Sequence, residues 1–130
     1  MEKKICLDTD FLVNFLRNKK EEVEFIIEND NNILATTLIN LFELYHGVYK
    51  YKEIQNNLMK LEELASRLII LNLSQESVKK AGQIASELEK SGNSIEFRDL
   101  LIGCVAQEEG YCLKTNNKKH FERILGLILV

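Results

Sequence analysis

The sequence has no proline, only three cysteines, no excess of basic residues and no long apolar run. Without proline, no fixed backbone angle or missing N–H interrupts a helix, so long helices are possible. The three cysteines are an odd number at no zinc-finger spacing, and this favours buried, reduced thiols in a cytoplasmic protein. These residues are Cys6, Cys104 and Cys112.

The charge balance and the hydropathy exclude two further classes of protein. A formal net charge of −3 does not suit a protein that coats nucleic acid through many phosphate contacts. Any nucleic acid must therefore meet a local site, where metal ions can supply the missing positive charge. No apolar run approaches the ~20 residues that span a bilayer, and the opening MEKKICLDTD does not suggest a signal peptide. We expect no membrane partner.

Short apolar segments alternate with amphipathic segments along the 130 residues. This order predicts one α/β domain over residues 1–130 with a mainly parallel central sheet. Burial of roughly two-thirds of the unfolded surface is usual at this size. Strands are expected at 4–8, 33–36, 68–73, 111–115 and in the final LILV segment, 127–130. Helices are expected at about 10–17, 21–28, 38–49, 53–67, 74–90 and 97–108.

The opening stretch ICLDTDFLVNF places acidic residues between two apolar segments. Asp8 and Asp10 follow the first expected strand, and Asn116 and Asn117 follow the strand at 111–115. Parallel strands end at one edge of the sheet, where ligands bind in such folds. Because a buried unpaired charge is costly, the acidic residues are either turn residues in water or ligands of a metal ion.

Two more carboxylates lie inside apolar helical segments. Glu43 lies within TLINLFELYHGV, and Asp99 opens RDLLIGCVA, which is apolar almost all round. Each has an ordinary explanation as well as a functional one. Asp99 in a first helical turn stabilises the helix start by about 0.3–1 kcal/mol, and Glu43 can face solvent. The residues alone leave these alternatives open.

Four segments in order resemble the PIN domain and, within that family, the VapC-type toxin ribonucleases of toxin–antitoxin pairs. They are LDTDFLVNFLR, TTLINLFELYHGV, IEFRDLLIGCVAQEEGYCLKTNN and NKKHFERILGLILV. Each motif alone is weak, but together they cover nearly the whole chain at the right spacing. The resemblance implies a three-layer α/β/α fold with a mainly parallel central sheet.

The resemblance also implies roles for individual residues. Asp8, Glu43 and Asp99 match the three acidic residues that bind the catalytic metal. Asn117 matches a position after the fourth strand where many PIN domains have a fourth acid, and Thr115 matches the small hydroxyl residue beside it.

Two positions depart from the usual pattern of this family. Asp10 stands where an asparagine is frequent, so it is expected to support the site without binding the metal directly. His120 stands where an acidic residue before Phe121 is frequent, which leaves occupancy by a second metal ion in doubt.

The chemistry implied by the resemblance is metal-dependent hydrolysis of RNA. Three converging carboxylates repel one another and raise one another's pKa, and Mg²⁺ or Mn²⁺ relieves this repulsion. Such an ion lowers the pKa of a bound water for attack on a phosphodiester, and endonucleolytic cleavage leaves a 3′-hydroxyl and a 5′-phosphate. The implied partners are an RNA substrate, a VapB-type antitoxin and a second copy of the chain, bound through the helices at 38–49, 53–67 and 74–90.

Other residues are weaker candidates. Thr9 either bonds a ligating carboxylate or caps the first helix, and His46 and His120 either reach the site or lie on the surface. Basic residues that can flank the cleft and bind the RNA backbone are Arg17, Lys19, Lys20, Lys118 and Lys119.

Three alternative functions remain from the sequence. The Asp-x-Asp after a strand also occurs in haloacid-dehalogenase-type phosphatases, where the first Asp is a nucleophile. Phe11 and Leu12 do not fit that motif. A housekeeping RNA-processing nuclease would share the same site residues, and a non-catalytic PIN-like binding module would share the fold.

Overall fold

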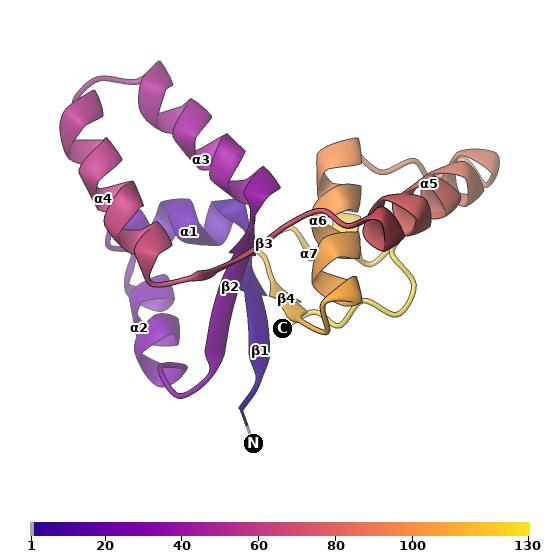
Figure 1. The fold of residues 1–130 in the computed structure, drawn as a ribbon, viewed down its shortest axis with the longest axis horizontal. Helices are drawn as coiled ribbons and strands as arrows, with labels where there is room; N and C mark the ends of the chain where they lie inside the picture. The colour runs from indigo at the N-terminus through magenta and orange to yellow at the C-terminus, as the bar shows by residue number, and fades with distance from the viewer. Residues whose placement is uncertain (1) are drawn as a thin grey trace.

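The computed structural model describes residues 2–130, and within them the chain alternates strands with helices (Figure 1). The strands are β1 (Lys4–Leu7), β2 (Ile33–Thr37), β3 (Ile69–Leu71) and β4 (Cys112–Lys114). The helices are α1 (Thr9–Leu16), α2 (Lys20–Glu28), α3 (Leu38–Lys50), α4 (Ile54–Ser66), α5 (Gln75–Lys90), α6 (Phe97–Glu108) and α7 (Lys118–Phe121).

The strands form one parallel sheet in the order β3-β2-β1-β4. From β1 the chain moves outward through β2 to β3, and then returns to place β4 on the other side of β1. The strand order therefore reverses between β1 and β4. Ligands in open α/β sheets bind at this point, outside the carboxyl ends of the strands.

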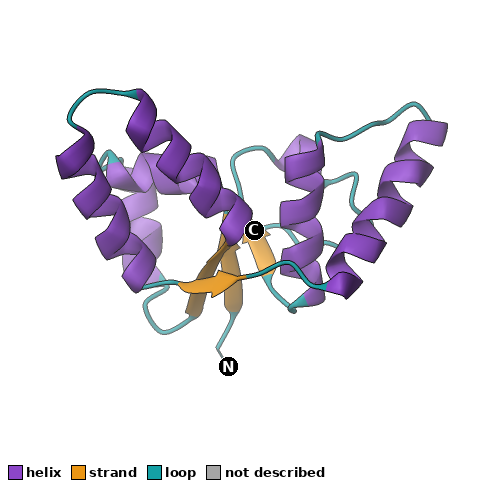
Figure 2. Ribbon diagram, turned by 45° about the horizontal axis from the view of Figure 1, so that its top comes forward, coloured by secondary structure: helices purple, strands orange, loops and turns teal. Residues whose placement is uncertain are grey.

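The alternation of side chains along β1 divides the core into two layers. Ile5 and Leu7 point to one face and pack with Phe11 and Leu12 of α1 and with residues of α3 and α4. Cys6 points to the other face, into a cluster with α5, α6 and the C-terminal segment. Figure 2 shows the two groups of helices leaning apart on either side of the sheet. The predicted three-layer α/β/α fold is confirmed.

Side-chain caps fix where several helices begin. The Thr37 hydroxyl accepts from the backbone N–H of Asn40 at the start of α3, and Ser74 does the same for Ser77 at the start of α5. Each of these caps satisfies a backbone N–H that has no partner within the helix. Gly110 follows α6 with a φ of +79°, a conformation that glycine adopts without strain.

The expected C-terminal strand is wrong. Within the described residues the LILV segment makes one isolated parallel bridge, between Leu113 and Leu129. Among the described residues of β4, the segment pairs with Leu113 alone, which donates its backbone N–H to the carbonyl of Ile128 at 2.8 Å and accepts from the N–H of Val130 at 3.0 Å. The short helix α7 was not predicted, because four residues carry too little periodicity to be recognised. None of the helices in residues 2–130 has the length and apolar character needed to cross a bilayer.

Candidate active site

Asp8 lies at the point where the strand order reverses and is almost fully buried, with 5% of its surface exposed. It follows β1 directly and is the N-cap of α1, where its Oδ1 accepts from the backbone N–H of Thr9 at 2.9 Å. Its Oδ2 accepts from the hydroxyl of Thr115 at 2.7 Å. Thr115 follows β4, so this bond joins the ends of the two neighbouring strands. Asp8 is therefore not a turn residue in water.

Asn40 orients the Asp8 carboxylate from the other side. This residue is fully buried in the first turn of α3, and its Nδ2 donates to Asp8 Oδ1 at 3.0 Å and to the Thr9 hydroxyl at 2.9 Å. Its Oδ1 accepts from the backbone N–H and the hydroxyl of Thr37. The amide is thus fixed with its donor side toward the acidic site.

Thr9 connects Asp8 to Glu43. The Thr9 hydroxyl donates to Glu43 Oε1 at 2.6 Å while it accepts from Asn40. Glu43 lies one helical turn after Asn40 on α3, so both side chains reach the same face of the helix. Glu43 is half-buried beside this network, which does not fit the alternative of a purely solvent-facing residue.

Asp99 approaches the site from the first turn of α6. Its Oδ2 lies 3.4 Å from Nδ1 of His120, and that nitrogen lies 2.9 Å from Nδ2 of Asn117. The backbone N–H of Asn117 donates to the Thr115 hydroxyl at 3.0 Å. A chain of short contacts therefore runs from Asp99 to Thr115, which itself bonds to Asp8.

Burial and neighbouring charges make ionisation of the acidic residues unfavourable. Burial raises the pKa of Asp8 to about 6, although the Thr115 hydrogen bond lowers it in part. The negative charges of Asp10 and Asp99 add to the rise, so these carboxylates lie close enough to repel Asp8. Burial also raises the pKa of Asp99, and the hydrogen bond with His120 opposes this rise. Such a site favours a bound cation.

The structure thus brings the three predicted ligands into one region but not around a single point. Asp8 and Glu43 share Thr9 as a common neighbour, whereas Asp99 faces His120. Within residues 2–130, no three His, Cys, Asp or Glu side chains are arranged to enclose an ion. The role of the three carboxylates as metal ligands stays a prediction.

Of the remaining sequence candidates, Asp10 and two lysines lie beside the residues that follow β4, whereas His46 lies on the surface. Asp10 Oδ1 accepts a hydrogen bond from the backbone N–H of Phe11 at 2.7 Å, and it lies 3.5 Å from the backbone nitrogen of Asn116. Lys118 and Lys119 line a hollow together with Thr115. His46 is exposed on α3, and its ring stacks on that of Phe42 with centroids 5.9 Å apart.

Asn40 is the residue of this site that the sequence analysis missed. Its two signals were the spacing from Thr37, which fits a capping pair at a strand-to-helix junction, and its place three residues before Glu43. Neither signal says that the amide also bonds Asp8, which lies 32 residues away along the chain.

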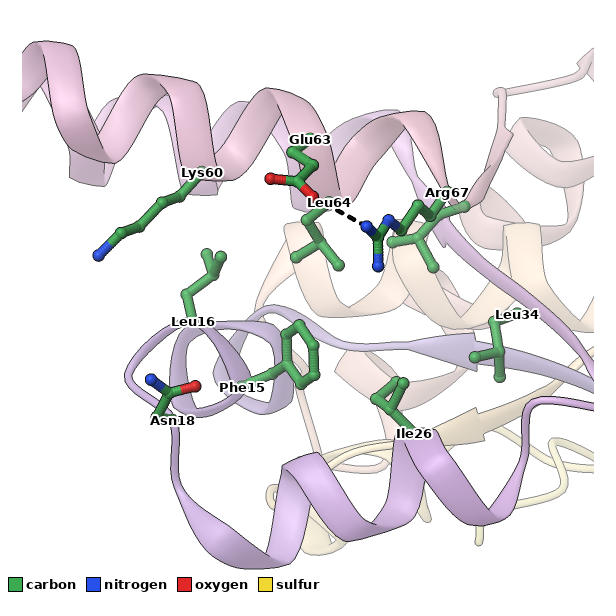
Figure 3. Close-up of a pocket in the computed structure, with 10 residues that line it drawn as sticks. Phe15, Leu16, Asn18, Ile26, Leu34, Lys60, Glu63, Leu64 and Arg67 are labelled. Atoms are coloured by element: carbon green, nitrogen blue, oxygen red, sulfur yellow. Dashed lines mark hydrogen bonds and ion pairs between the residues drawn. The ribbon is translucent and has the colours of Figure 1, made fainter.

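An apolar groove lies between α1, α2 and α4 (Figure 3). It has a volume of about 300 Å³, and Lys60, Glu63 and Arg67 stand at its edge. Leu16 and Lys60 also line a second hollow of about 200 Å³, which contains Glu43 and Arg17. The apolar residues of the groove are Phe15, Leu16, Ile26, Leu34, Leu64 and Leu68.

A parallel α/β/α sheet with the buried Asp8 after β1, and with acidic residues on α3 and α6, is the arrangement that the resemblance to the PIN domain implied. The chain belongs to the PIN domain family, whose sequence model matches residues 5–126. This membership leaves the phosphatase alternative without support.

Within this family the chain is similar to VapC ribonucleases. It is 42% identical over 99 residues to Ribonuclease VapC2 of Rickettsia felis, an alignment that covers 76% of this chain and 74% of the relative. It is 31% identical over 124 residues to the tRNA(fMet)-specific endonuclease VapC of Salmonella typhimurium, covering 95% and 94% of the two chains. A crystal structure of DNA-bound VapBC from Salmonella typhimurium superposes with a TM-score of 0.89 at 30% identity and covers 100% of this chain and 98% of that one.

Proposed function

We propose that this protein is a divalent-metal-dependent endoribonuclease of the VapC type, and that it is the toxin of a toxin–antitoxin pair. The observation that carries this proposal is the environment of Asp8. It is a buried carboxylate at the point where the strand order reverses, joined to Glu43 through Thr9 and repelled by the charge of Asp99. The relatives named ribonuclease VapC support the same activity.

The donor groups of the site fit a hard cation. Asp8, Glu43 and Asp99 offer carboxylate oxygens, which Mg²⁺ and Mn²⁺ prefer. The charge of an ion would offset the burial, and the repulsion from Asp10 and Asp99, that raise the pKa of Asp8. A bound ion of this kind supplies an acidified water and neutralises charge on the phosphodiester.

The protein's own groups hold the carboxylates in place for this chemistry. Thr115 and Asn40 bond the two oxygens of Asp8, so its carboxylate cannot rotate freely. Thr9 fixes one oxygen of Glu43 and leaves the other available. His120 lies beside Asp99, with its Nδ1 3.4 Å from Oδ2 of that carboxylate.

The apolar groove supports a protein partner. The similar Salmonella typhimurium structure is of VapBC bound to DNA, and we propose that a VapB-type antitoxin places a segment in the groove between α1, α2 and α4. The apolar floor, with Lys60 at its edge and Arg17 in the adjoining hollow, suits an amphipathic, acidic segment that extends toward Glu43. Toxin and antitoxin would then form one cytoplasmic complex.

An RNA cleavage assay tests the proposed activity. The purified chain should cleave RNA in Mg²⁺ or Mn²⁺, lose this activity in excess chelator and leave 5′-phosphate and 3′-hydroxyl ends. Glu43→Gln should fold normally but cleave RNA at least ~100-fold more slowly, the size of effect expected when a group central to charge stabilisation is lost. Absence of metal binding by calorimetry would instead favour the non-catalytic module.

A second test separates a toxin from a housekeeping nuclease. Expression in cells should arrest growth, and co-expression of the protein encoded by the neighbouring gene should relieve the arrest and co-purify with this chain. A housekeeping nuclease would process RNA without arresting growth.

A further inference from the structure

Two adjoining hollows border the acidic site on the side of β4 and α2. The first has a volume of about 510 Å³ and contains Thr115, whose hydroxyl bonds Asp8. The second, of about 460 Å³, contains Asn14 and the first residues of α2. Asn116 lines both hollows, and its backbone N–H lies 3.5 Å from Oδ1 of Asp10. The junction of the two hollows therefore adjoins the acidic site.

Lysines gather along these two hollows. The first hollow is lined by three of them and the second by two, in a chain whose formal net charge is −3. The five are Lys19, Lys20, Lys114, Lys118 and Lys119. The acidic residues of the lining are Glu21 and Glu22, and Glu22 is buried with its Oε2 bonded to Asn14. The lining of the two hollows therefore has an excess of positive charge.

These lysines have few partners of their own. Within the described part of the chain, Lys20 alone of the five forms an ion pair, at 3.9 Å to Glu24, and both side chains of that pair are largely exposed. Lys114 is held over the ring of Phe25, with its ammonium 4.9 Å from the ring centroid. Apart from that of Lys20, the ammonium groups have no carboxylate partner within the described residues, so they are available to an external anion.

We infer that the two hollows form a track for the phosphate groups of a single-stranded RNA, and that Asn116 marks the point where the strand passes the acidic site. This inference rests on the proposed ribonuclease function. Lysine contacts to phosphates fix the register of a strand without reading its bases, so the track supplies affinity and placement but no sequence preference. Arg17 is not part of the track, because it lines the separate hollow of about 200 Å³ that contains Glu43.

The salt dependence of RNA binding tests the track directly. A labelled single-stranded oligouridylate is titrated with the protein in excess EDTA, which prevents cleavage, at several NaCl concentrations. Each neutralised phosphate of a single strand contributes ~0.7 to the slope of log K against log salt. We expect Lys118→Gln/Lys119→Gln to lower the slope by about 1.4, and Lys19→Gln/Lys20→Gln to lower it by a similar amount. The quadruple variant should combine both losses.

Lys79→Gln/Lys90→Gln is the matched control, since both residues are exposed on α5 and the charge change is the same. Its slope should equal that of the wild type. An equal loss of slope in the control and the track variants would overturn the inference, because the effect would then come from net charge. An unchanged slope in both track variants, with circular dichroism showing that they are folded, would also overturn it.

The wild type's cleavage assay in Mg²⁺ keeps this inference separate from the proposed function. If the wild type cleaves RNA but the track variants keep the full salt slope, the track is wrong and the ribonuclease stands. If the wild type fails to cleave any RNA while the slopes change as expected, the hollows bind single-stranded RNA and the proposed ribonuclease function fails.

Discussion

The Asp8 carboxyl group is in a site that fixes its position but opposes its charge. Hydrogen bonds from Thr9, Asn40 and Thr115 hold both oxygens, yet burial and two acidic neighbours raise its pKa. This combination suits a metal site, because a cation offsets the unfavourable negative charge and binds to oxygens that are already oriented.

The raised pKa of Asp8 predicts how the metal-free protein responds to pH. The pKa rises from 3.8 to about 6 on folding, so the folded state binds this proton more tightly than the unfolded state. The free energy of unfolding should therefore fall as pH rises from about 4 to about 6, by up to ~3 kcal/mol for this group alone. Urea denaturation in EDTA across this range, compared with Asp8→Asn, isolates the effect. Parallel pH profiles for the two proteins would show that ionisation of Asp8 does not destabilise the folded state, which would contradict the prediction.

Substitution of Asp99 by asparagine separates a metal ligand from a helix-stabilising residue. If Asp99 only stabilises the start of α6, the variant should lose about 1 kcal/mol or less and keep its activity. We expect instead that Asp99→Asn binds Mg²⁺ or Mn²⁺ more weakly, loses RNA cleavage, and melts no lower than the wild type without metal. The stability is retained because burial makes the Asp99 charge unfavourable. Calorimetric titration measures the metal affinity and thermal melts measure the stability, with Asp30→Asn, a substitution of an exposed residue, as the control.

Helices α5 and α6 each contain a glycine, and their surroundings differ. A Cβ at Gly103 of α6 would collide with the terminal methyl group of Ile124, which is buried, and would press on Leu127. A Cβ at Gly82 of α5 would meet no atom within 4 Å. The close approach of α6 to the C-terminal segment therefore depends on the missing side chain at Gly103.

This difference predicts opposite effects of the same substitution. Gly82→Ala should raise the free energy of unfolding by up to ~1 kcal/mol through helix propensity. Gly103→Ala gains the same propensity but overpacks the core, which typically costs 1–3 kcal/mol, so a net loss of about 1 kcal/mol is expected. Urea denaturation of both variants provides the comparison. Equal stabilisation by the two would mean that Ile124 repacks freely.

The predicted homodimer concerns the outer surfaces of α3 to α5. Exposed apolar side chains there include Phe42 of α3, at 58%, and Val78 of α5, at 48%. Apolar surface of this kind is characteristic of subunit interfaces. Light scattering at micromolar concentration should give about twice the chain mass of 15.1 kDa.

A matched pair of variants locates the interface. Phe42→Ser should weaken the dimer at least ~10-fold, as expected for the loss of a buried aromatic anchor. Ile27→Ser removes a comparably exposed residue of α2, at 66%, and should leave the dimer unchanged. A wild-type monomer at these concentrations, or dissociation caused equally by both variants, would contradict the predicted surface.

Most of the fold could be predicted from the sequence, because local patterns determine each element. Apolar runs such as KICL specify strands, and the Ser74 cap and the glycine after Glu109 specify where helices begin and end. The alternation of strands and helices then specifies a parallel sheet. The placement of Asp8 at the carboxyl end of β1 followed from the same reasoning.

The arrangement around Asp8 depended on the tertiary structure. Thr115 bonds Asp8 from 107 residues away, and Asn40 does so from 32. The contact with Thr115 exists because β4 returns to the side of β1. The same return places the lysines after β4 next to those of α2, around Asn116. A periodic pattern specifies which face a residue occupies within its own element, whereas the packing of all the elements together specifies which distant residue it meets.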